Sequence, residues 1–270
     1  MKFPGGPQGR PRRRFGQHFL HDPAVIERIA AAIAPRSGEA LVEIGPGRGA
    51  LTRRLLQSDC GTLDAIEIDR DLAALLREEW SGDPRFTLHG ADALRVDFGD
   101  LARQRGQSLR VIGNLPYNIS TPLLFHLLQS ARHIRDLHVM LQREVIARMA
   151  AMPGDSAYGR LTVMLAPWVH VERLFDVGPG AFQPPPQVWS AVARLTVRPE
   201  PAFPVSPAFS AIVAAAFSHR RKTLRNALRG LATPEQIASC GVDPSVRPET
   251  VSPAQFNAIA GKLELPDGPS

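Results

Sequence analysis

The feature that most limits the fold is the alternation of short apolar runs with helical segments through the first half of the chain. The apolar runs fall at residues 41–44, 63–68, 86–88, 110–113 and 137–141. Between and before them lie helical segments, the first of which begins with a capping Asp22 and with Pro23 at the first helical position. Strands that alternate with helices build a mostly parallel sheet covered on both faces. We therefore predict an α/β fold with a Rossmann-like sheet.

Two further strands are expected later in the chain, at residues 161–171 and 190–197, and they bring the predicted sheet to seven strands. A loop rich in Gly and Pro separates them. Three prolines then fall within residues 198–204, where they prevent regular structure. We place a domain boundary there and assign residues 15–200 to the α/β domain.

Residues 201–270 are predicted to form a small all-helical domain. Two segments within them begin with a hydroxyl residue, then proline, and then glutamine three positions after the hydroxyl residue. This pattern occurs at residues 233–236 and 252–255, and it is typical of the first turn of a helix. At the other end of the chain, residues 1–14 are predicted to be a flexible basic tail.

Composition excludes several classes of protein. A chain of 270 residues with 44% hydrophobic residues is long enough to bury a large core. It contains no run of about 18 apolar residues that would span a membrane, and its first residues lack the apolar centre of a secretory signal. Its two cysteines, Cys60 and Cys240, have neither a disulfide pattern nor zinc-site spacing. We expect a cytoplasmic protein with no metal and no membrane partner.

Basic residues are concentrated in two short segments. The chain has 32 Lys and Arg against 26 Asp and Glu, which gives a net charge of +6. Residues 1–14 and 216–230 each hold five basic residues and no acidic ones. Such clusters are expected where a protein binds nucleic-acid phosphates, although a solvated tail and a solvated helix face have the same composition. The candidate RNA-binding residues are Arg220, Arg221, Lys222 and Arg225.

Three predicted strands end in residues suited to a nucleoside. The first runs into Glu43-Ile44-Gly45-Pro46-Gly47-Arg48-Gly49, the second ends at Glu67, and Asp92 follows the third. Ligands of such sheets bind at the carboxyl ends of the strands. There Gly45 and Gly47 would let a ligand approach the backbone, Glu67 would accept both hydroxyls of a ribose, and Asp92 would accept an adenine amino group. Each feature alone also fits an ordinary turn or cap.

The fourth strand ends in Asn114-Leu115-Pro116-Tyr117, which indicates the reaction. An exocyclic amine on a base is a poor nucleophile because its lone pair is delocalised into the ring. The side-chain oxygen of Asn114 and a backbone carbonyl near Leu115 would accept its two N–H bonds and direct the lone pair toward a methyl group. Pro116 would make the turn rigid, and Tyr117 would stack on an extruded base. The alternative is a buried turn in which the asparagine caps a backbone group.

A stiff loop further along the chain offers a second aromatic ring. It reads Gly180-Ala181-Phe182-Gln183-Pro184-Pro185-Pro186, and the run of prolines restricts its backbone. We predict that Phe182 lies on the other side of the captured base from Tyr117. A plain proline-rich linker is the alternative.

These motifs together resemble the ribosomal RNA adenine N6,N6-dimethyltransferases, in particular the bacterial small-subunit (16S) enzymes. Each motif alone is unspecific, but their combination and order are highly specific. The motifs that carry the resemblance are Phe15-Gly16-Gln17-His18-Phe19-Leu20, Glu43-Ile44-Gly45-Pro46-Gly47-Arg48-Gly49, Asn114-Leu115-Pro116-Tyr117-Asn118-Ile119-Ser120-Thr121, Phe182-Gln183-Pro184-Pro185-Pro186 and Arg220-Arg221-Lys222-Thr223-Leu224-Arg225.

The resemblance implies a class I methyltransferase sheet and S-adenosylmethionine as methyl donor. The residues it assigns to the donor are His18, Leu20, Gly45, Gly47, Glu67, Asp92 and Asn114. The family often has asparagine where this chain has His18, and either side chain can donate to the donor's carboxylate. The resemblance further implies that the target is two adjacent adenines in the 3′-terminal hairpin of 16S rRNA, within an immature 30S subunit, and we expect the protein to act as a monomer.

Three alternatives stay open from the sequence. A large-subunit rRNA dimethyltransferase of the macrolide-resistance type has similar donor motifs. A non-catalytic checkpoint factor for ribosome assembly would keep the same surface with a vestigial pocket. A nicotinamide oxidoreductase would share the spacing Gly45-x-Gly47-x-x-Ala50.

Overall fold

A computed structural model describes residues 18–117, 119–218 and 221–263. The chain divides into two compact units. The first comprises Met1–Ile146 and Glu172–Val197, and the second comprises Ala147–Val171 and Arg198–Ser270. The predicted basic tail, residues 1–14, lies outside the described residues.

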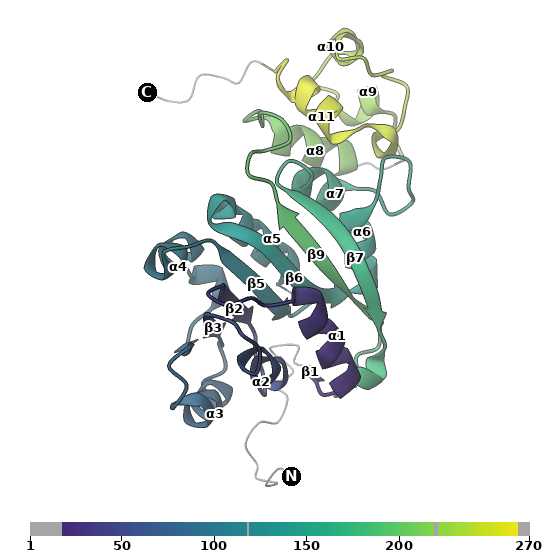
Figure 1. The fold of residues 1–270 in the computed structure, drawn as a ribbon. Coiled ribbons are helices and arrows are strands. Elements are labelled where there is room, and N and C mark those ends of the chain that lie inside the picture. Colours follow the sequence, from purple (N-terminus) through teal and green to yellow (C-terminus); the bar gives the residue numbers. More distant parts are fainter. Residues whose placement is uncertain (1–17, 118, 219–220, 264–270) are drawn as a thin grey trace. The chain divides into compact units, whose positions relative to one another are not determined.

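The first unit is built on a seven-stranded sheet with the strand order β4-β3-β2-β5-β6-β9-β7 (Figure 1). Strands β2 to β6 pair in parallel, and β9 pairs antiparallel with β6. The predicted α/β fold with a mostly parallel seven-stranded sheet is therefore confirmed. The strands are β2 (Ala40–Ile44), β3 (Thr62–Ile66), β4 (Phe86–His89), β5 (Leu109–Asn114), β6 (Ile134–Gln142), β7 (Val169–Val177) and β9 (Ser190–Val197).

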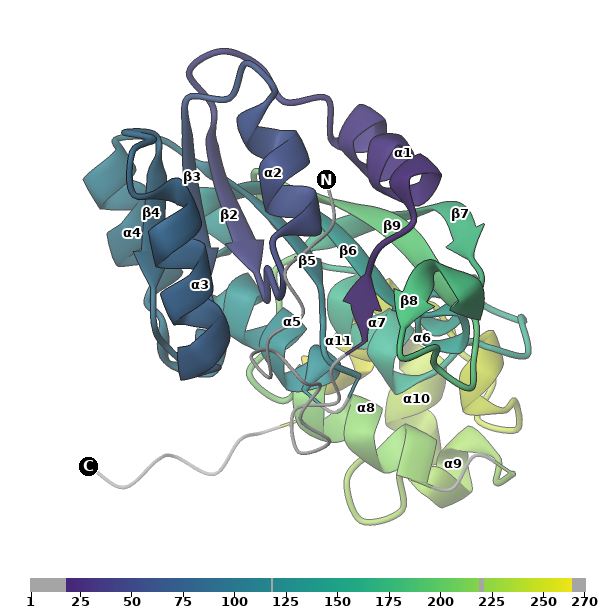
Figure 2. The same ribbon diagram turned by 90° about the horizontal axis from the view of Figure 1, so that it is seen from below.

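Helices cover both faces of this sheet, with α1 to α3 on one face and α4 and α5 on the other (Figures 1 and 2). On the first face, Ile33 and Leu55 from the helices pack with Leu63 and Ile112 from the strands. The predicted Asp22 cap is present, since its carboxylate accepts from the backbone N–H groups of Ala24 and Val25. The helices are α1 (Pro23–Ile33), α2 (Ala50–Leu56), α3 (Arg70–Trp80), α4 (Phe98–Arg105), α5 (Ser120–Gln129) and α6 (Arg143–Ala150).

A second, two-stranded sheet joins the start of the described chain to the proline-rich loop. Strand β1 (Phe19–Leu20) pairs antiparallel with β8 (Phe182–Gln183). The backbone N–H of His21 adds a 3.0 Å hydrogen bond to the carbonyl of Ala181. Strands of two residues carry no hydrophobic period, so the sequence did not predict them.

The strand expected at residues 161–171 is wrong over its first half. Residues Arg160–Leu165 form helix α7, and β7 begins only at Val169. A short apolar run without a period fits a buried helix as well as a strand. The expected domain limits change with it, because Ala147–Val171 groups with the C-terminal residues. The chain passes from the first unit to the second for the last time between Val197 and Arg198, and the domain boundary expected near residue 200 stays a prediction.

The second unit has its own apolar core, built mainly by α8 and α11. Phe209 and Ile212 on α8 pack with Phe256 and Ile259 on α11. Both predicted capping patterns form capping boxes, at the starts of α10 and α11. The described helices of this unit are α7, α8 (Phe209–Ser218), α9 (Leu224–Ala227), α10 (Pro234–Ser239) and α11 (Pro253–Ala260), with a short 3-10 turn, η5 (Pro248–Thr250).

Tyr158 connects the segment Ala147–Val171 to the C-terminal part of this core. Its ring is buried, and its hydroxyl donates a 2.7 Å hydrogen bond to the carbonyl of Val251. Tyr158→Phe removes the donor and leaves that carbonyl unpaired, so we expect a loss of about 1–3 kcal/mol in the free energy of unfolding. Urea unfolding followed by circular dichroism measures it. The control Met152→Ala, at a side chain that is 67% exposed, should change stability by less than about 0.5 kcal/mol; equal effects of the two changes would contradict the contact.

Candidate functional site

The carboxyl ends of β2, β3, β4 and β5 surround a cavity. Residues from the turn after each of these strands line it, together with His18 and Phe19 from the start of the described chain. The structure therefore brings together the turns that the sequence analysis had selected one by one. The lining residues among the predicted site are His18, Gly45, Gly47, Glu67, Asp92, Asn114, Leu115, Pro116 and Tyr117.

The glycine turn after β2 is fixed to the end of β3. Gly45 and Gly47 have φ angles of +68° and +58°, a region that side chains other than glycine rarely adopt. The N–H of Gly45 donates to the carbonyl of Ile66, which continues the pairing of the two strands by one residue. The N–H of Gly47 donates to the Glu67 carboxylate at 3.2 Å. This turn is thus held with its backbone against the cavity.

The Glu67 carboxylate is buried at the cavity wall. Besides Gly47, it accepts a 2.9 Å hydrogen bond from the N–H of Asp69. Burial raises the pKa of Glu67, and the two backbone donors oppose that rise. Each carboxylate oxygen has room for a further hydrogen bond, so Glu67 can still accept the hydroxyls of a ribose.

Asp92 caps a short 3-10 turn, η2 (Ala93–Arg95), that follows β4. One carboxylate oxygen accepts a 3.0 Å hydrogen bond from the N–H of Leu94. The capping role anticipated as the alternative is therefore present. Asp92 also lines the cavity beside Glu67, and a carboxylate has more lone pairs than one cap uses.

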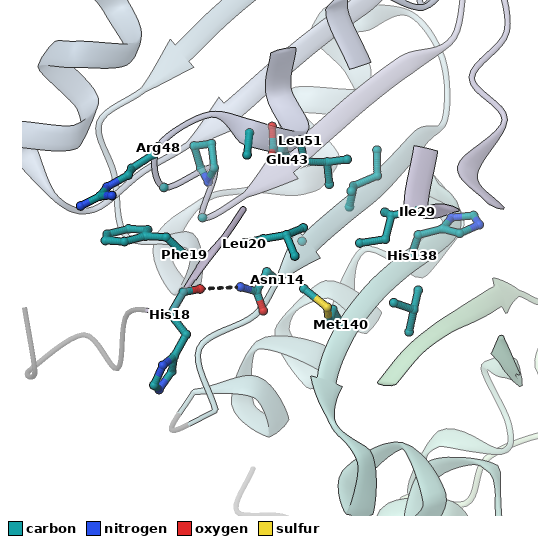
Figure 3. A pocket seen from close by; sticks show the side chains of 17 residues that line it. His18, Phe19, Leu20, Ile29, Glu43, Arg48, Leu51, Asn114, His138 and Met140 are labelled. Atoms are coloured by element: carbon teal, nitrogen blue, oxygen red, sulfur yellow. Dashed lines mark hydrogen bonds between the residues drawn. The ribbon is translucent and has the colours of Figure 1, made fainter. Parts of the chain in front are cut away.

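The Asn114 amide is held by one hydrogen bond at the end of β5. Its Nδ2 donates to the backbone carbonyl of His18 at 3.0 Å (Figure 3). The N–H of Leu115 donates to the carbonyl of Met140 on β6, which fixes the next residue of the turn. Because Nδ2 is engaged, the orientation of the amide is set and Oδ1 is left as the acceptor that the predicted chemistry needs.

Tyr117 lies two residues beyond Leu115, across Pro116. Its hydroxyl shares a 2.8 Å hydrogen bond with the Ser190 hydroxyl, at the start of β9. Burial raises the pKa of Tyr117, so the phenol stays neutral at ordinary pH. One face of the ring is near the His18 imidazole, with ring centroids 6.0 Å apart and planes inclined by 28°. The ring is thus anchored at its hydroxyl end and flanked by a second ring.

His18 directly precedes β1, and Leu20 is the last residue of that strand. The Nδ1 atom of His18 is 2.8 Å from the carbonyl oxygen of Pro184, so in this structure the imidazole bonds the proline-rich loop. Its remaining nitrogen is the one that can face a donor's carboxylate. Leu20 lines a neighbouring cavity rather than the one at Tyr117.

The expected place of Phe182 needs correction. The side chain is 2% exposed and packs in the apolar core with Val177, Ala181 and Val192. It is pinned there because Phe182 is part of strand β8, paired with Leu20 on β1. In this structure the ring presents no face to a base, and the ring beside Tyr117 is that of His18.

The neighbouring cavity contains a carboxyl group that the sequence analysis did not select as a site residue. Glu43, in β2, lines it together with Asn114, Met140 and Leu51 (Figure 3). Its carboxylate accepts a 2.6 Å hydrogen bond from the Thr52 hydroxyl. Burial raises the pKa of Glu43 to about 7, the nearby Glu67 charge adds to the rise, and the Thr52 hydrogen bond opposes it. The sequence signal that could have identified Glu43 is its place as an acidic residue inside an otherwise apolar strand.

The predicted basic cluster belongs to the second unit. Arg221, Lys222 and Arg225 are exposed, whereas Arg220 lies outside the described residues. The N–H groups of Leu224 and Arg225 donate to the carbonyls of Val246 and Pro244, which anchors this segment. Arg225 and Arg229 also line a shallow hollow. The described residues of this segment therefore offer cations to solvent.

These features fit a nucleoside-containing methyl donor. Within the described residues, the site offers one acid after each of two strands, Glu67 and Asp92. It also offers a glycine turn whose backbone faces the cavity, and an asparagine whose amide oxygen is left as an acceptor. In the same residues no group of three His, Cys, Asp or Glu side chains is placed to hold a metal ion. None of the described helices has the length and apolar character to cross a membrane.

Fold and site together define a methyltransferase with a Rossmann-like sheet. The model of the family "Ribosomal RNA adenine dimethylase" matches residues 9–264. The chain belongs to this family, and it is an S-adenosylmethionine-dependent enzyme. Family membership excludes the nicotinamide oxidoreductase reading.

Relatives of known name agree with this assignment. The chain is 52% identical to "Ribosomal RNA small subunit methyltransferase A" of Pseudomonas aeruginosa, over 96% of this chain and 97% of that protein. It is also 52% identical to the protein of the same name from Thiobacillus denitrificans, over 94% of this chain and 98% of that protein.

Two solved structures share the fold over most of their length. The 23S rRNA methyltransferase ErmE has a TM-score of 0.70 and 28% identity, covering 91% of this chain and 99% of its own. A dimethyladenosine transferase from Plasmodium falciparum has a TM-score of 0.77 and 23% identity, covering 90% of this chain and 96% of its own. The second likeness shows the fold alone.

The raised pKa of Glu43 gives the protein a specific dependence on pH. A carboxyl whose pKa is higher in the folded state holds its proton more tightly there, so stability falls as pH rises from about 4.5 to about 7 and then levels off. Glu43→Gln keeps the shape and removes the titration. We expect the wild-type protein to lose about 3 kcal/mol relative to the variant across that window.

Urea unfolding at several pH values between 4.5 and 8 measures this difference. Glu39→Gln is the control: burial raises the pKa of Glu39, but hydrogen bonds from Arg110, Arg36 and Arg135 outweigh that effect and hold the pKa below its usual value. The pH dependence of that variant relative to wild type should have the opposite sign. Parallel curves for wild type and Glu43→Gln would contradict the buried, titrating carboxyl.

Proposed function

We propose that this enzyme dimethylates N6 of two adjacent adenines in the 3′-terminal hairpin of small-subunit (16S) rRNA. The observation that carries the proposal is the Asn114 amide, held by its Nδ2 with its oxygen left to accept, beside the anchored ring of Tyr117. The 52% identity to small-subunit methyltransferases, against 28% to a 23S rRNA enzyme, favours the small-subunit target over the large-subunit alternative.

Residues at three strand ends would hold the donor. Glu67 would accept the ribose hydroxyls, Asp92 the adenine amino group, and the backbone of Gly45 and Gly47 would lie against the methionine part. His18 and Leu20 would complete the site from β1. S-adenosylmethionine supplies, when bound, an electrophilic methyl group on a positively charged sulfur that is a good leaving group.

The chain's own residues then act mainly by alignment. Asn114 Oδ1 and the backbone carbonyl near Leu115 would accept the two N–H bonds of the adenine amine and turn its lone pair outward. Pro116 keeps the turn rigid, and Tyr117 stacks on the base. Asn114 is neutral, so it positions and polarises the amine, and the proton released from the methylated nitrogen leaves to water. Such positioning lowers the barrier without a strong base.

The second unit would bind the RNA backbone. Arg221, Lys222 and Arg225, together with Arg220, place positive charge on one short segment that has no acidic residue. The partner would be 16S rRNA inside an immature 30S subunit, met in the cytoplasm, and the protein would act as a monomer with a role in subunit assembly. The alternative is a checkpoint role without catalysis. The Asn114 amide oxygen, left as an acceptor for the amine, favours the catalytic role.

Replacement of Asn114 tests the role of its amide. In Asn114→Ala the amine loses an acceptor that matters in the transition state, so turnover at saturating donor should fall at least about 100-fold. RNA affinity should stay within about threefold, because phosphate contacts dominate it. Methyl transfer from labelled donor to unmethylated small subunits, followed by nucleoside analysis for dimethyladenosine, gives the rate. Full turnover in this variant would refute the role, and product on 50S but not 30S particles would refute the target.

The basic segment should set the salt dependence of RNA binding. Replacing Arg221, Lys222 and Arg225 together with glutamine removes up to three phosphate contacts. The slope of log K against log salt concentration should therefore become shallower by about 2–3. Filter binding to small-subunit RNA at about 50–300 mM salt measures this slope. The control replaces the exposed Arg36, Arg77 and Arg103 of the first unit with glutamine, which changes the net charge equally; an equal change of slope would show a general charge effect.

A further inference from the structure

Trp189 stands out because it is a large aromatic residue left half in solvent beside the site. Its exposed fraction is 50%, and the preceding Val188 is 43% exposed. The other two tryptophans, Trp80 and Trp168, are both more buried. None of the roles assigned above uses Trp189, and an exposed indole has an energetic cost in water that packing does not recover.

The position of Trp189 is fixed relative to Tyr117. Trp189 immediately precedes Ser190, whose hydroxyl bonds the Tyr117 hydroxyl at 2.8 Å. The Trp189 carbonyl accepts a 2.9 Å hydrogen bond from the N–H of Arg143, the first residue of α6. Because β9 runs antiparallel to β6 and pairs Ser190 with Gln142, its first residues lie at the same sheet edge as the candidate base site.

The surroundings of the indole suit a base rather than another apolar side chain. The Arg143 guanidinium lies over the ring, 5.9 Å from its centroid. It is half exposed, and its ion pair to Asp176 is long, at 3.9 Å, while Asp176 is held more closely by Arg173. An exposed ring with a cation beside it is the combination that binds unpaired bases, since the ring stacks on the base and the cation faces the phosphate.

We infer that Trp189 is a stacking platform for the unpaired nucleotide next to the target adenine in the RNA strand. This inference rests on the proposed function, because it assumes that the target base enters beside Tyr117. Extrusion of that base leaves its neighbour without a stacking partner. Trp189, one residue from the serine that anchors Tyr117, replaces the lost stack, and Arg143 contacts the backbone of the same nucleotide.

The first test compares Trp189→Ala with Trp189→Phe. Loss of the ring should raise the KM for small subunits by about 5- to 100-fold, the range given by removal of a base-stacking aromatic. The kcat and the donor affinity should stay nearly unchanged, and phenylalanine should restore most of the loss. Leu75→Ala, which removes another exposed apolar side chain from the first unit, should have no effect. A change in kcat alone, or no rescue by phenylalanine, would overturn the inference.

The second test asks whether the partner is a base. A hairpin RNA with two adjacent adenines is prepared with a normal nucleotide or an abasic one on either side of the target, and binding is followed by fluorescence anisotropy. Trp189→Ala should weaken binding to the normal RNA, and the abasic site on one side should abolish the difference between variant and wild type. An effect on whole subunits but not on the hairpin would show a protein contact instead and overturn the inference.

The two proposals fail differently. If wild-type protein methylates small-subunit RNA and the tryptophan variants match it, only the role of Trp189 is wrong. If wild-type protein transfers no methyl group to that RNA, the proposed function is wrong, and the stacking role falls with it.

Discussion

The site depends on the parallel register of three central strands. Ile44 of β2 is paired with Ile66 of β3 and with Gly113 of β5, so the three strands end level with one another. Hydrogen bonds from Gly45 to Ile66 and from Glu67 to His89 extend the pairing just past the strand ends. The glycine turn, the buried acid and the asparagine therefore meet at one edge. A slip of one residue in any strand would turn its terminal side chain to the other face of the sheet.

The start of the described chain completes this edge from outside the sheet. The backbone carbonyl of His18 accepts a hydrogen bond from Asn114 Nδ2, and the His18 imidazole is hydrogen-bonded to the carbonyl of Pro184. Together with the pairing of β1 and β8, these bonds connect the asparagine to the proline-rich loop. The orientation of the asparagine amide is thus set by a backbone group far away in the sequence, and a substitution that shifts β1 would disturb the acceptor without touching it.

How much the sequence predicts follows from the range of the interactions involved. The strand ends at Gly45, Glu67 and Asn114 are local events, each marked by a change from apolar to polar or glycine, and the structure places all three at one cavity. The burial of Phe182 depends on a two-residue pairing with Leu20, more than 150 residues away. No periodic signal reports such a pairing. The same limit applies to α7, where a short, mostly apolar segment fits a helix or a strand.

The arrangement of charge in the first unit fits an enzyme that works by position rather than by proton transfer. Glu43 and Glu67 are both buried with raised pKa values, yet each is held by donors of the chain, Thr52 for one and two backbone N–H groups for the other. The groups expected to hold the adenine, the Asn114 amide and the Tyr117 phenol, are neutral at ordinary pH. Because a sulfonium methyl is already activated, the reaction asks only that the amine be aligned and its N–H bonds be accepted. Neutral acceptors meet this demand without the desolvation cost of burying a charge.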